Sequence, residues 1–328
     1  MMRHACRTIA ALVAALVVTG VYAQDNPYKE DGWAMLPDGR KWGATSAVDI
    51  DRDGNLWVFE RCGGTTCLGS NVHPLVKLDP SGKYLKSFGA GMFVQPHGIH
   101  VDRDNNVWVT DAQGKDGKGH IVVKFNQDGK VLLTLGKPGV PGNGPDTFNQ
   151  PSDVVTAPNG DIFVADGHGG ESNARIVKFS KDGKFLKAWG RKGTGPGEFD
   201  TPHAIAFDSQ GRLFVGDRSN NRIQIFDQDG NFLEEWKQFG RPSGIFIDRN
   251  DILYVADHAS SEKNNPGFKR GVRIGSVKDG VVKSFIPGLG AGPEGHIVGE
   301  GVVADALGNV YWAETQAGMT VRKFLIRK

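Results

Sequence analysis

The segment HAIAFDSQGRLFVGD, from His203 to Asp217, is one copy of a unit that recurs along the chain. Apolar and other residues alternate in AIAF and in LFVG, as in half-buried β-strands, and the DSQGR turn between them places glycine where positive φ is needed. Five further copies read SAVDIDRDGNLWVFE, HGIHVDRDNNVWVTD, SDVVTAPNGDIFVAD, SGIFIDRNDILYVAD and EGVVADALGNVYWAE, and they begin at Ser46, His97, Ser152, Ser243 and Glu300.

Each copy is followed by two more short strands that resemble RIVKF and GKFLKAWG, so the chain contains six units of four strands. A single unit cannot bury an apolar face, and the sequence therefore predicts an all-β, six-bladed β-propeller. The last copy lacks a fourth strand. We expect GWAMLPDGRKWG, residues 32–43, to supply it, so that an N-terminal strand closes the ring in the last blade. An open two-sheet sandwich is the alternative, but it does not explain the recurrence.

Residues 1–23 have the pattern of an export signal. MMRHACR is a short basic region, IAALVAALVV is apolar, and VYA before Gln24 matches a cleavage site for small residues. We therefore expect a signal peptide over 1–23 and the propeller over 24–328, in a secreted or periplasmic protein with no membrane association after cleavage. An uncleaved membrane anchor is the alternative.

Composition and charge exclude some partners. With 46 Gly and 16 Pro among 328 residues, the chain is typical of a turn-rich β protein. Without Arg3 and Arg7 of the predicted signal, the 39 basic residues fall to the number of acidic ones, 37. A near-neutral chain lacks the basic surface of a nucleic-acid-binding protein. We expect a monomer that does not bind nucleic acid.

Cys62 and Cys67 are the two cysteines of the predicted mature chain. In an oxidising compartment such a pair is expected to close a small loop as a disulfide. Metal binding is the alternative, although two thiolates alone rarely complete a zinc site.

The first residue of each copy is predicted to face the central channel, because the first strand of a blade is the innermost one. In order, the six blades place there Ser46, His97, Ser152, His203, Ser243 and Glu300. Alternate blades thus carry His97, His203 and Glu300, and two imidazoles with a carboxylate can bind a catalytic metal that keeps an open position. Zinc is our first expectation, and another divalent transition metal is the alternative. His296 is a second candidate for the third ligand, and we interpret His100 as structural.

The loops after the second strands supply further candidates. Arg61 and Arg218 both follow the acidic residue that ends such a strand, and their planar guanidinium groups suit a carboxylate ligand. A salt bridge between blades is the structural alternative. His168 and His258 lie on equivalent loops, where a histidine near a metal can act as a general base. The strand-end acids themselves are interpreted as loop caps.

The copies resemble NHL repeats, and the predicted mature chain resembles the peptidyl-α-hydroxyglycine α-amidating lyases, which are six-bladed propellers. The resemblance implies a zinc ligand at His97 in QPHG and at His203 in TPHA. The third family histidine is Glu300 here. The family's next residue, an Asp associated with structural calcium, is Gly301, so the resemblance does not support calcium.

The same resemblance implies roles for three loop residues. Arg61 in FERCGG corresponds to the family's catalytic arginine, and Arg218 in GDRSNNR to a second arginine of the active site. His168 in DGHGG stands where the family has its catalytic tyrosine. The implied activity is metal-dependent cleavage of a peptidyl-α-hydroxyglycine-type carbinolamide, a small-molecule or peptide substrate, to an amide and glyoxylate.

Two other functions remain open at the level of sequence. The same ring of ligands also suits another metal-dependent lyase or hydrolase that acts on a small substrate. Alternatively, the chain is a non-catalytic propeller whose loops bind a peptide, a glycan or a protein partner.

Overall fold

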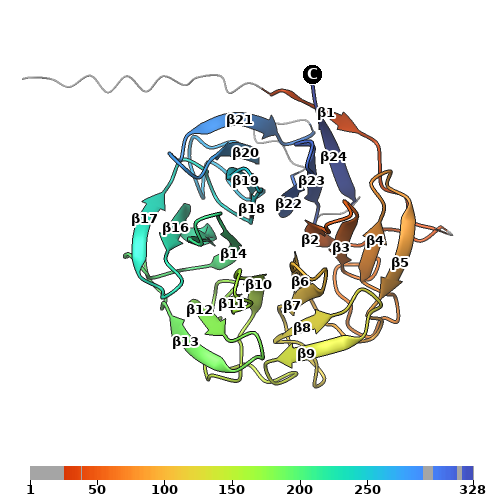
Figure 1. The fold of residues 1–328 in the computed structure, drawn as a ribbon, viewed down its shortest axis with the longest axis vertical. Coiled ribbons are helices and arrows are strands. Elements are labelled where there is room, and N and C mark those ends of the chain that lie inside the picture. Colours follow the sequence, from red (N-terminus) through yellow and green to blue (C-terminus); the bar gives the residue numbers. More distant parts are fainter. Residues whose placement is uncertain (1–25, 38, 291–297, 316–319, 328) are drawn as a thin grey trace, which may run out of the picture.

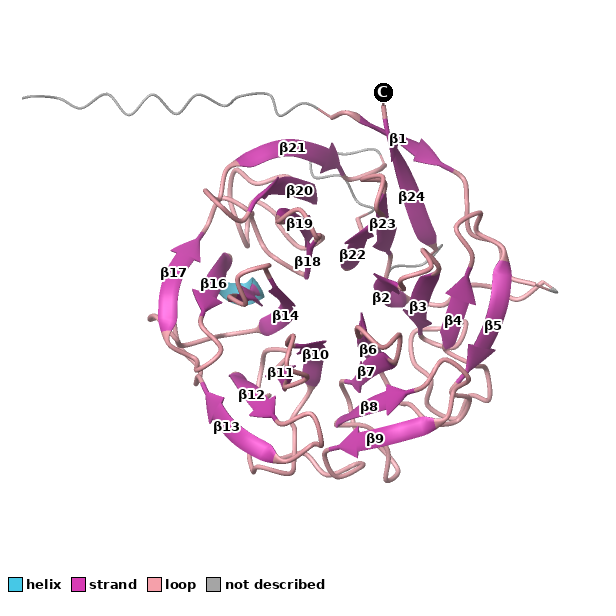
Figure 2. Cartoon of the chain, viewed as in Figure 1, coloured by secondary structure: helices cyan, strands magenta, loops and turns pink. Residues whose placement is uncertain are grey.

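A computed structural model describes residues 26–37, 39–290, 298–315 and 320–327 of this protein. The predicted signal peptide, residues 1–23, lies outside the described residues. Six four-stranded antiparallel sheets stand around a central axis, and a short 3-10 helix, η1 (Arg218–Asn220), is the only helix in the described part of the chain (Figures 1 and 2). None of these residues belongs to a helix long and apolar enough to cross a membrane. The prediction of a six-bladed β-propeller is confirmed.

Each blade is numbered in chain order and contains an inner, a second, a third and an outer strand. The inner strands, which surround the channel, are β2 (Thr45–Ile50), β6 (Pro96–Val101), β10 (Pro151–Thr156), β14 (Pro202–Phe207), β18 (Gly244–Ile247) and β22 (Gly301–Ala304). The second strands are β3 (Leu56–Glu60), β7 (Val107–Asp111), β11 (Ile162–Asp166), β15 (Leu213–Asp217), β19 (Ile252–Asp257) and β23 (Val310–Ala313). The third strands are β4 (Leu75–Leu78), β8 (Ile121–Phe125), β12 (Arg175–Phe179), β16 (Arg222–Phe226), β20 (Gly271–Ser276) and β24 (Val321–Ile326). The outer strands are β5 (Tyr84–Phe88), β9 (Val131–Leu135), β13 (Phe185–Trp189), β17 (Phe232–Trp236), β21 (Val282–Pro287) and β1 (Tyr28–Asp31).

The N-terminal strand closes the ring, but it begins earlier than predicted. Blade 6 has the strand order β1-β24-β23-β22, and β1 pairs antiparallel with β24 (Figure 1). The prediction of a strand within residues 32–43 was wrong, because the described residues of that segment contain no strand. Its apolar side chains, Trp33, Leu36 and Trp42 among them, instead pack onto the junction between blades 6 and 1.

Buried side chains fill the spaces between the blades. Six apolar clusters each join two neighbouring blades, and the cluster between blades 6 and 1 completes the circle. Between blades 1 and 2, for example, Phe59 and Phe93 meet edge to face with ring centroids 5.0 Å apart. Each blade is therefore stabilised by both neighbours, and the ring holds its inner strands in fixed positions.

Small residues at the second position of most copies of the repeated unit, such as Gly98, Gly244 and Gly301, let adjacent inner strands approach closely. A methyl group added at Gly244 of β18 would overlap the carbonyl oxygen of Glu300 in the next blade. We expect Gly244→Ala to lower the free energy of unfolding by about 1–3 kcal/mol, the usual cost of overpacking. Urea unfolding measures this loss, with Gly32→Ala as the control because a methyl group there meets no atom of the described residues within 4 Å. Equal losses in the two variants would contradict the close approach.

Candidate metal centre

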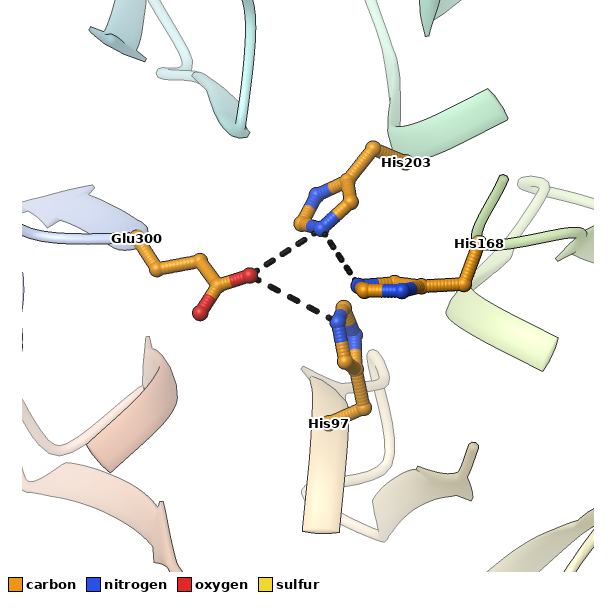
Figure 3. A group of neighbouring side chains, drawn as sticks. All are labelled: His97, His168, His203 and Glu300. Carbon is orange, nitrogen blue, oxygen red and sulfur yellow. Dashed lines mark hydrogen bonds and ion pairs between the residues drawn. The ribbon is translucent and has the colours of Figure 1, made fainter. Parts of the chain in front are cut away.

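Four side chains converge in the channel, at the end where the loops that follow the second strands lie. His97, His168, His203 and Glu300 each offer one ligand atom, and these atoms all lie within 4.8 Å of one another. Figure 3 shows the three imidazoles and the carboxylate pointing toward a common centre. The residues come from blades 2, 3, 4 and 6. The three predicted ligands are therefore brought together, and His168 joins them.

β-Bulges orient the side chains of the two inner-strand histidines. The pairing register shifts between Pro96 and Ile99 in β6, and between Pro202 and Ala204 in β14, so the histidine within each shift leaves the regular ladder. Such bulges commonly re-aim a side chain.

The buried acid that ends the second strand holds the segment before each of these histidines. Asp111 accepts hydrogen bonds from the backbone N–H groups of Val94 and Gln95, and Asp217 accepts from Asp200 and Thr201 in the equivalent place. These contacts agree with the interpretation of the strand-end acids as loop caps.

Backbone carbonyls of the next blade fix the tautomers of His97 and His203. Nδ1 of His97 lies 2.7 Å from the carbonyl oxygen of Ser152, and Nδ1 of His203 lies 2.6 Å from that of Ser243. A carbonyl oxygen only accepts, so each Nδ1 carries the proton. Each Nε2 then presents its lone pair to the centre, as a metal ligand must, and the carbonyl is the usual partner of the second ring nitrogen.

The donor atoms face one another in a way that fits a cation. Nε2 of His203 lies 3.0 Å from Oε1 of Glu300 and 3.2 Å from Nε2 of His168, and Nε2 of His97 lies 3.6 Å from the same carboxylate oxygen. Nε2 of His97 is buried and has no hydrogen-bond partner among the residues that the structure describes. Burial lowers the pKa of His203 to about 3, Arg218 adds to the effect, and Glu300 opposes it. Neutral imidazoles and a carboxylate with converging lone pairs are the donor set of a divalent metal.

The electrostatics of His168 and Glu300 agree with this assignment. Burial lowers the pKa of His168 well below its usual value, and the neighbouring His97 and His203 contribute. Burial alone would raise the pKa of Glu300, but contacts with His203 and His97 hold it well below its usual range. The low pKa values of His168 and His203 keep these two imidazoles neutral beside the ionised carboxylate of Glu300.

Two arginines stand beside the centre, as predicted from their shared position. Nη1 of Arg218 lies 3.6 Å from Oε1 of Glu300, and η1 begins at this residue. Arg61 donates from Nε to the carbonyl oxygen of Pro96 at 3.2 Å, and the amide oxygen of Gln95 accepts from the same Nε at 2.9 Å. Both guanidinium groups are largely buried, and burial lowers the pKa of each. The positive charges of Arg61 and Arg218 exceed the single negative charge of Glu300, so the site favours an anionic ligand.

A disulfide between Cys62 and Cys67 closes the loop that follows Arg61, which confirms the predicted pairing. The loop is further tied by hydrogen bonds from Cys67 N–H and the Thr66 hydroxyl to the carbonyl oxygen of Val94. It therefore connects Arg61 of blade 1 to the segment that leads into His97 of blade 2.

We expect the double variant Cys62→Ser, Cys67→Ser to lose about 2 kcal/mol of unfolding free energy, the loop-closure value for so short a ring. Guanidinium unfolding of the oxidised protein and the variant measures the difference. Metal content should not change, because none of the four ligands lies in the loop. An unaltered stability would show that the bond does not constrain the chain.

The channel is narrow directly below the ligands and wider beyond. Farther along the inner strands, a cavity lined among others by His100 and Phe207 has a volume of about 320 Å³. The section lined by Ser46, His97, Ser152, His203 and Ser243 has a volume of only about 50 Å³, which holds little more than water. A larger ligand therefore has to approach the centre from the face that carries Arg61 and Arg218.

Other predicted residues lie as follows. His296 falls outside the described residues. His100 lies farther along β6, where Nε2 is 2.9 Å from the Thr156 hydroxyl and Nδ1 is 3.5 Å from the carboxylate of Asp49, consistent with a structural role. Sequence reasoning placed His168 near the metal only as a proton carrier. It has no inner-strand position, and Gly167, with φ of 154°, precedes it at the point where the chain leaves β11.

Comparison with known proteins agrees with the fold and adds enzymes to its relatives. Residues 146–237 match a family model described as a 6-bladed beta-propeller. NHL repeat-containing protein 3 of Mus musculus is 35% identical over 182 residues, which are 54% of this chain and 50% of the mouse protein. Peptidyl-alpha-hydroxyglycine alpha-amidating lyase 1 of Drosophila melanogaster is 38% identical over 170 residues, 46% of this chain and 30% of that protein. The matches thus span half or less of these relatives' lengths.

Among solved structures, a gluconolactonase from Xanthomonas campestris superposes with a TM-score of 0.59 at 16% identity, over 87% of this chain and 86% of the other. Identity at this level shows the fold alone. The chain is a β-propeller with six blades. Its sequence is similar to those of NHL repeat proteins and of peptidyl-α-hydroxyglycine α-amidating lyases.

Proposed function

We propose that this protein is a metal-dependent lyase that cleaves a peptidyl-α-hydroxyglycine-type carbinolamide into an amide and glyoxylate. One observation carries the proposal: three imidazoles and a carboxylate converge within 4.8 Å of one another beside two arginines. The sequence similarity to a lyase that acts on peptidyl-α-hydroxyglycine supports the choice of reaction.

His97, His168, His203 and Glu300 would hold the metal. Zinc is the proposed ion, although three nitrogens and one oxygen also suit manganese or iron. When bound, the ion supplies Lewis acidity that makes the substrate hydroxyl more acidic. His168 serves here as a ligand, which revises the proton-transfer role expected from the sequence, because its Nε2 lies among the other donor atoms.

Arg61 and Arg218 would bind the carboxylate of the substrate. Arg61 has its guanidinium held by Gln95 and Pro96 next to the ligand His97, and Arg218 approaches Glu300 from blade 4. Two partly desolvated guanidinium groups favour the anionic product as it forms, since a low dielectric strengthens their attraction to it. No oxidant is needed: the C–N bond breaks, the carbinol carbon becomes a carbonyl carbon, and the hydroxyl proton moves to the amide nitrogen.

A binding propeller is the second candidate, because the similarity to an NHL repeat-containing protein covers 54% of the chain. In that case the exposed loops would bind a peptide or a protein partner. Metal content separates the two proposals, because a binding module needs no stoichiometric ion.

Export from the cytoplasm is also proposed. The Cys62–Cys67 disulfide supports it, since such bonds persist in oxidising compartments. The secreted or periplasmic location is tested by fractionating cells that express the full-length chain.

The decisive experiment combines elemental analysis with a glyoxylate assay. Purified protein should contain about one equivalent of zinc or a related metal, and it should release glyoxylate from N-benzoyl-α-hydroxyglycine. Removal of the metal by a chelator should abolish the release, and zinc should restore it. Protein that is fully loaded with metal and still releases no glyoxylate would falsify the lyase proposal.

A further inference from the structure

His258 occupies the same position in blade 5 that Arg61 and Arg218 occupy in blades 1 and 4. Each of the three follows directly after the acid that ends the second strand of its blade. This register places all three on the loop face of the ring, at the mouth of the channel. His258 differs from His168 in that it is not one of the four converging ligands.

The loop of His258 is fixed by the buried carboxylate of Asp257. Asp257 accepts hydrogen bonds from the backbone N–H groups of Ser260 and Arg241, and from the Ser260 hydroxyl. Arg273 pairs with the same carboxylate at 3.2 Å. The backbone next to His258 is therefore held in place without a contribution from the imidazole.

The Ser243 hydroxyl contacts His258 in a way that its counterparts in other blades do not. The hydroxyls of Ser46 and Ser152 donate to the carbonyl oxygens of Pro96 and Pro202 in the following blade. The Ser243 hydroxyl instead lies 2.6 Å from Nδ1 of His258. The backbone carbonyl oxygen of Ser243 accepts a hydrogen bond from Nδ1–H of the ligand His203. Ser243 thus links His258 to the metal centre.

We propose that His258 transfers the proton in the lyase reaction, with Ser243 as its positioning residue. This inference rests on the proposed function. Nε2 of His258 accepts the proton of the substrate hydroxyl while the C–N bond breaks, and it returns that proton to the amide nitrogen, which holds the electron pair of the broken bond. Nε2 can accept a proton only when Nδ1 already carries one, so the Ser243 hydroxyl oxygen accepts from Nδ1–H before and after the transfer and holds the ring in this tautomer.

The surroundings of His258 suit this task. Burial lowers the pKa of His258 to about 4, and the charges of Glu300 and Arg218 act on it in opposite directions. A neutral imidazole has one nitrogen that accepts a proton and one that donates a hydrogen bond. A ring coordinated to a metal has no free accepting nitrogen, because the metal occupies it. The role expected of His168 from the sequence therefore passes to His258, the histidine near the centre that lies outside the ligand group.

The test compares His258→Ala with wild-type protein for metal content, turnover and binding of lactate, a hydroxy acid without a scissile C–N bond. We expect unchanged metal content, lactate affinity within about threefold, and a fall in kcat of about 100- to 1,000-fold. Added imidazole should restore part of the lost kcat. Ser243→Ala should lower kcat by about tenfold, the lower end of second-shell effects. The control Ser209→Ala, which removes a hydroxyl bonded to Asp251 outside the site, should leave kcat unchanged.

The outcomes separate this inference from the proposed function. If metal-loaded wild-type protein releases no glyoxylate, the lyase proposal fails, and the inference fails with it. If the wild type is active and His258→Ala keeps more than half of its kcat, only the inference is overturned. Loss of metal or of lactate binding in His258→Ala, without rescue by imidazole, also overturns it, because such a result assigns His258 a structural role.

Discussion

His203→Ala is expected to abolish stoichiometric metal binding and to lower glyoxylate release by about 1,000-fold or more, the range in which metal-assisted chemistry is lost. His203 contributes a nitrogen that lies 3.0 Å from the carboxylate of Glu300 and 3.2 Å from Nε2 of His168. Removal of this imidazole takes away the contact with Glu300 and leaves three of the four donor side chains. Elemental analysis of the purified variant, together with the glyoxylate assay, measures both effects.

His100→Ala is the matched control for this experiment. It also removes an imidazole from an inner strand, but His100 is bonded to Thr156 and lies outside the converging group. Its metal content should equal that of the wild type. A His203→Ala protein that keeps a full equivalent of metal would contradict the proposed ligand set.

Arg61→Ala is expected to lower kcat/KM by about 100- to 1,000-fold, the typical effect of removing a preorganised group that stabilises a developing anion. Arg61→Lys should recover little of this activity, because an ammonium group cannot reproduce the planar contacts with Gln95, Pro96 and a substrate carboxylate. Steady-state kinetics with N-benzoyl-α-hydroxyglycine provide the measurement.

Arg191→Ala controls for the loss of a positive charge. The Arg191 side chain is 81% exposed and pairs with Glu198 on the surface, so its removal should not affect kcat/KM. If Arg61→Ala retains wild-type kcat/KM, then Arg61 is a structural link between blades 1 and 2 and does not contact the substrate.

Periodicity made the fold predictable. The turn between the first two strands of a unit can be recognised from a few neighbouring Asp, Asn and Gly residues. Its six occurrences predicted both the number of blades and which strands are innermost. The closing strand was placed wrongly for a physical reason. Trp33 and Trp42 gave residues 32–43 the apolar character of a strand, but these side chains cover a junction between blades. The shorter segment YKED pairs with β24 instead.

The site was predictable where it follows the repeat and obscure where it does not. His97, His203 and Glu300 share one position in the unit, so the circular arrangement alone places them around one axis. His168 reaches the centre from a loop whose path depends on the backbone at Gly167, and no periodic rule describes that path. The contact of His258 with Ser243 joins a loop to the residue that precedes the inner strand β18. The only sign of it in the sequence was the position that His258 shares with Arg61 and Arg218.

The pairing of β1 with β24 has a consequence for how the metal centre assembles. Glu300 belongs to the blade that is completed only when the two ends of the propeller meet, whereas His97, His168 and His203 lie in blades whose four strands are consecutive. During refolding, a complete set of four donors therefore depends on the slow, long-range event that seals the circle. Uptake of the ion then reports the final step of folding, and a chain that lacks residues 28–31 should bind the ion late and weakly.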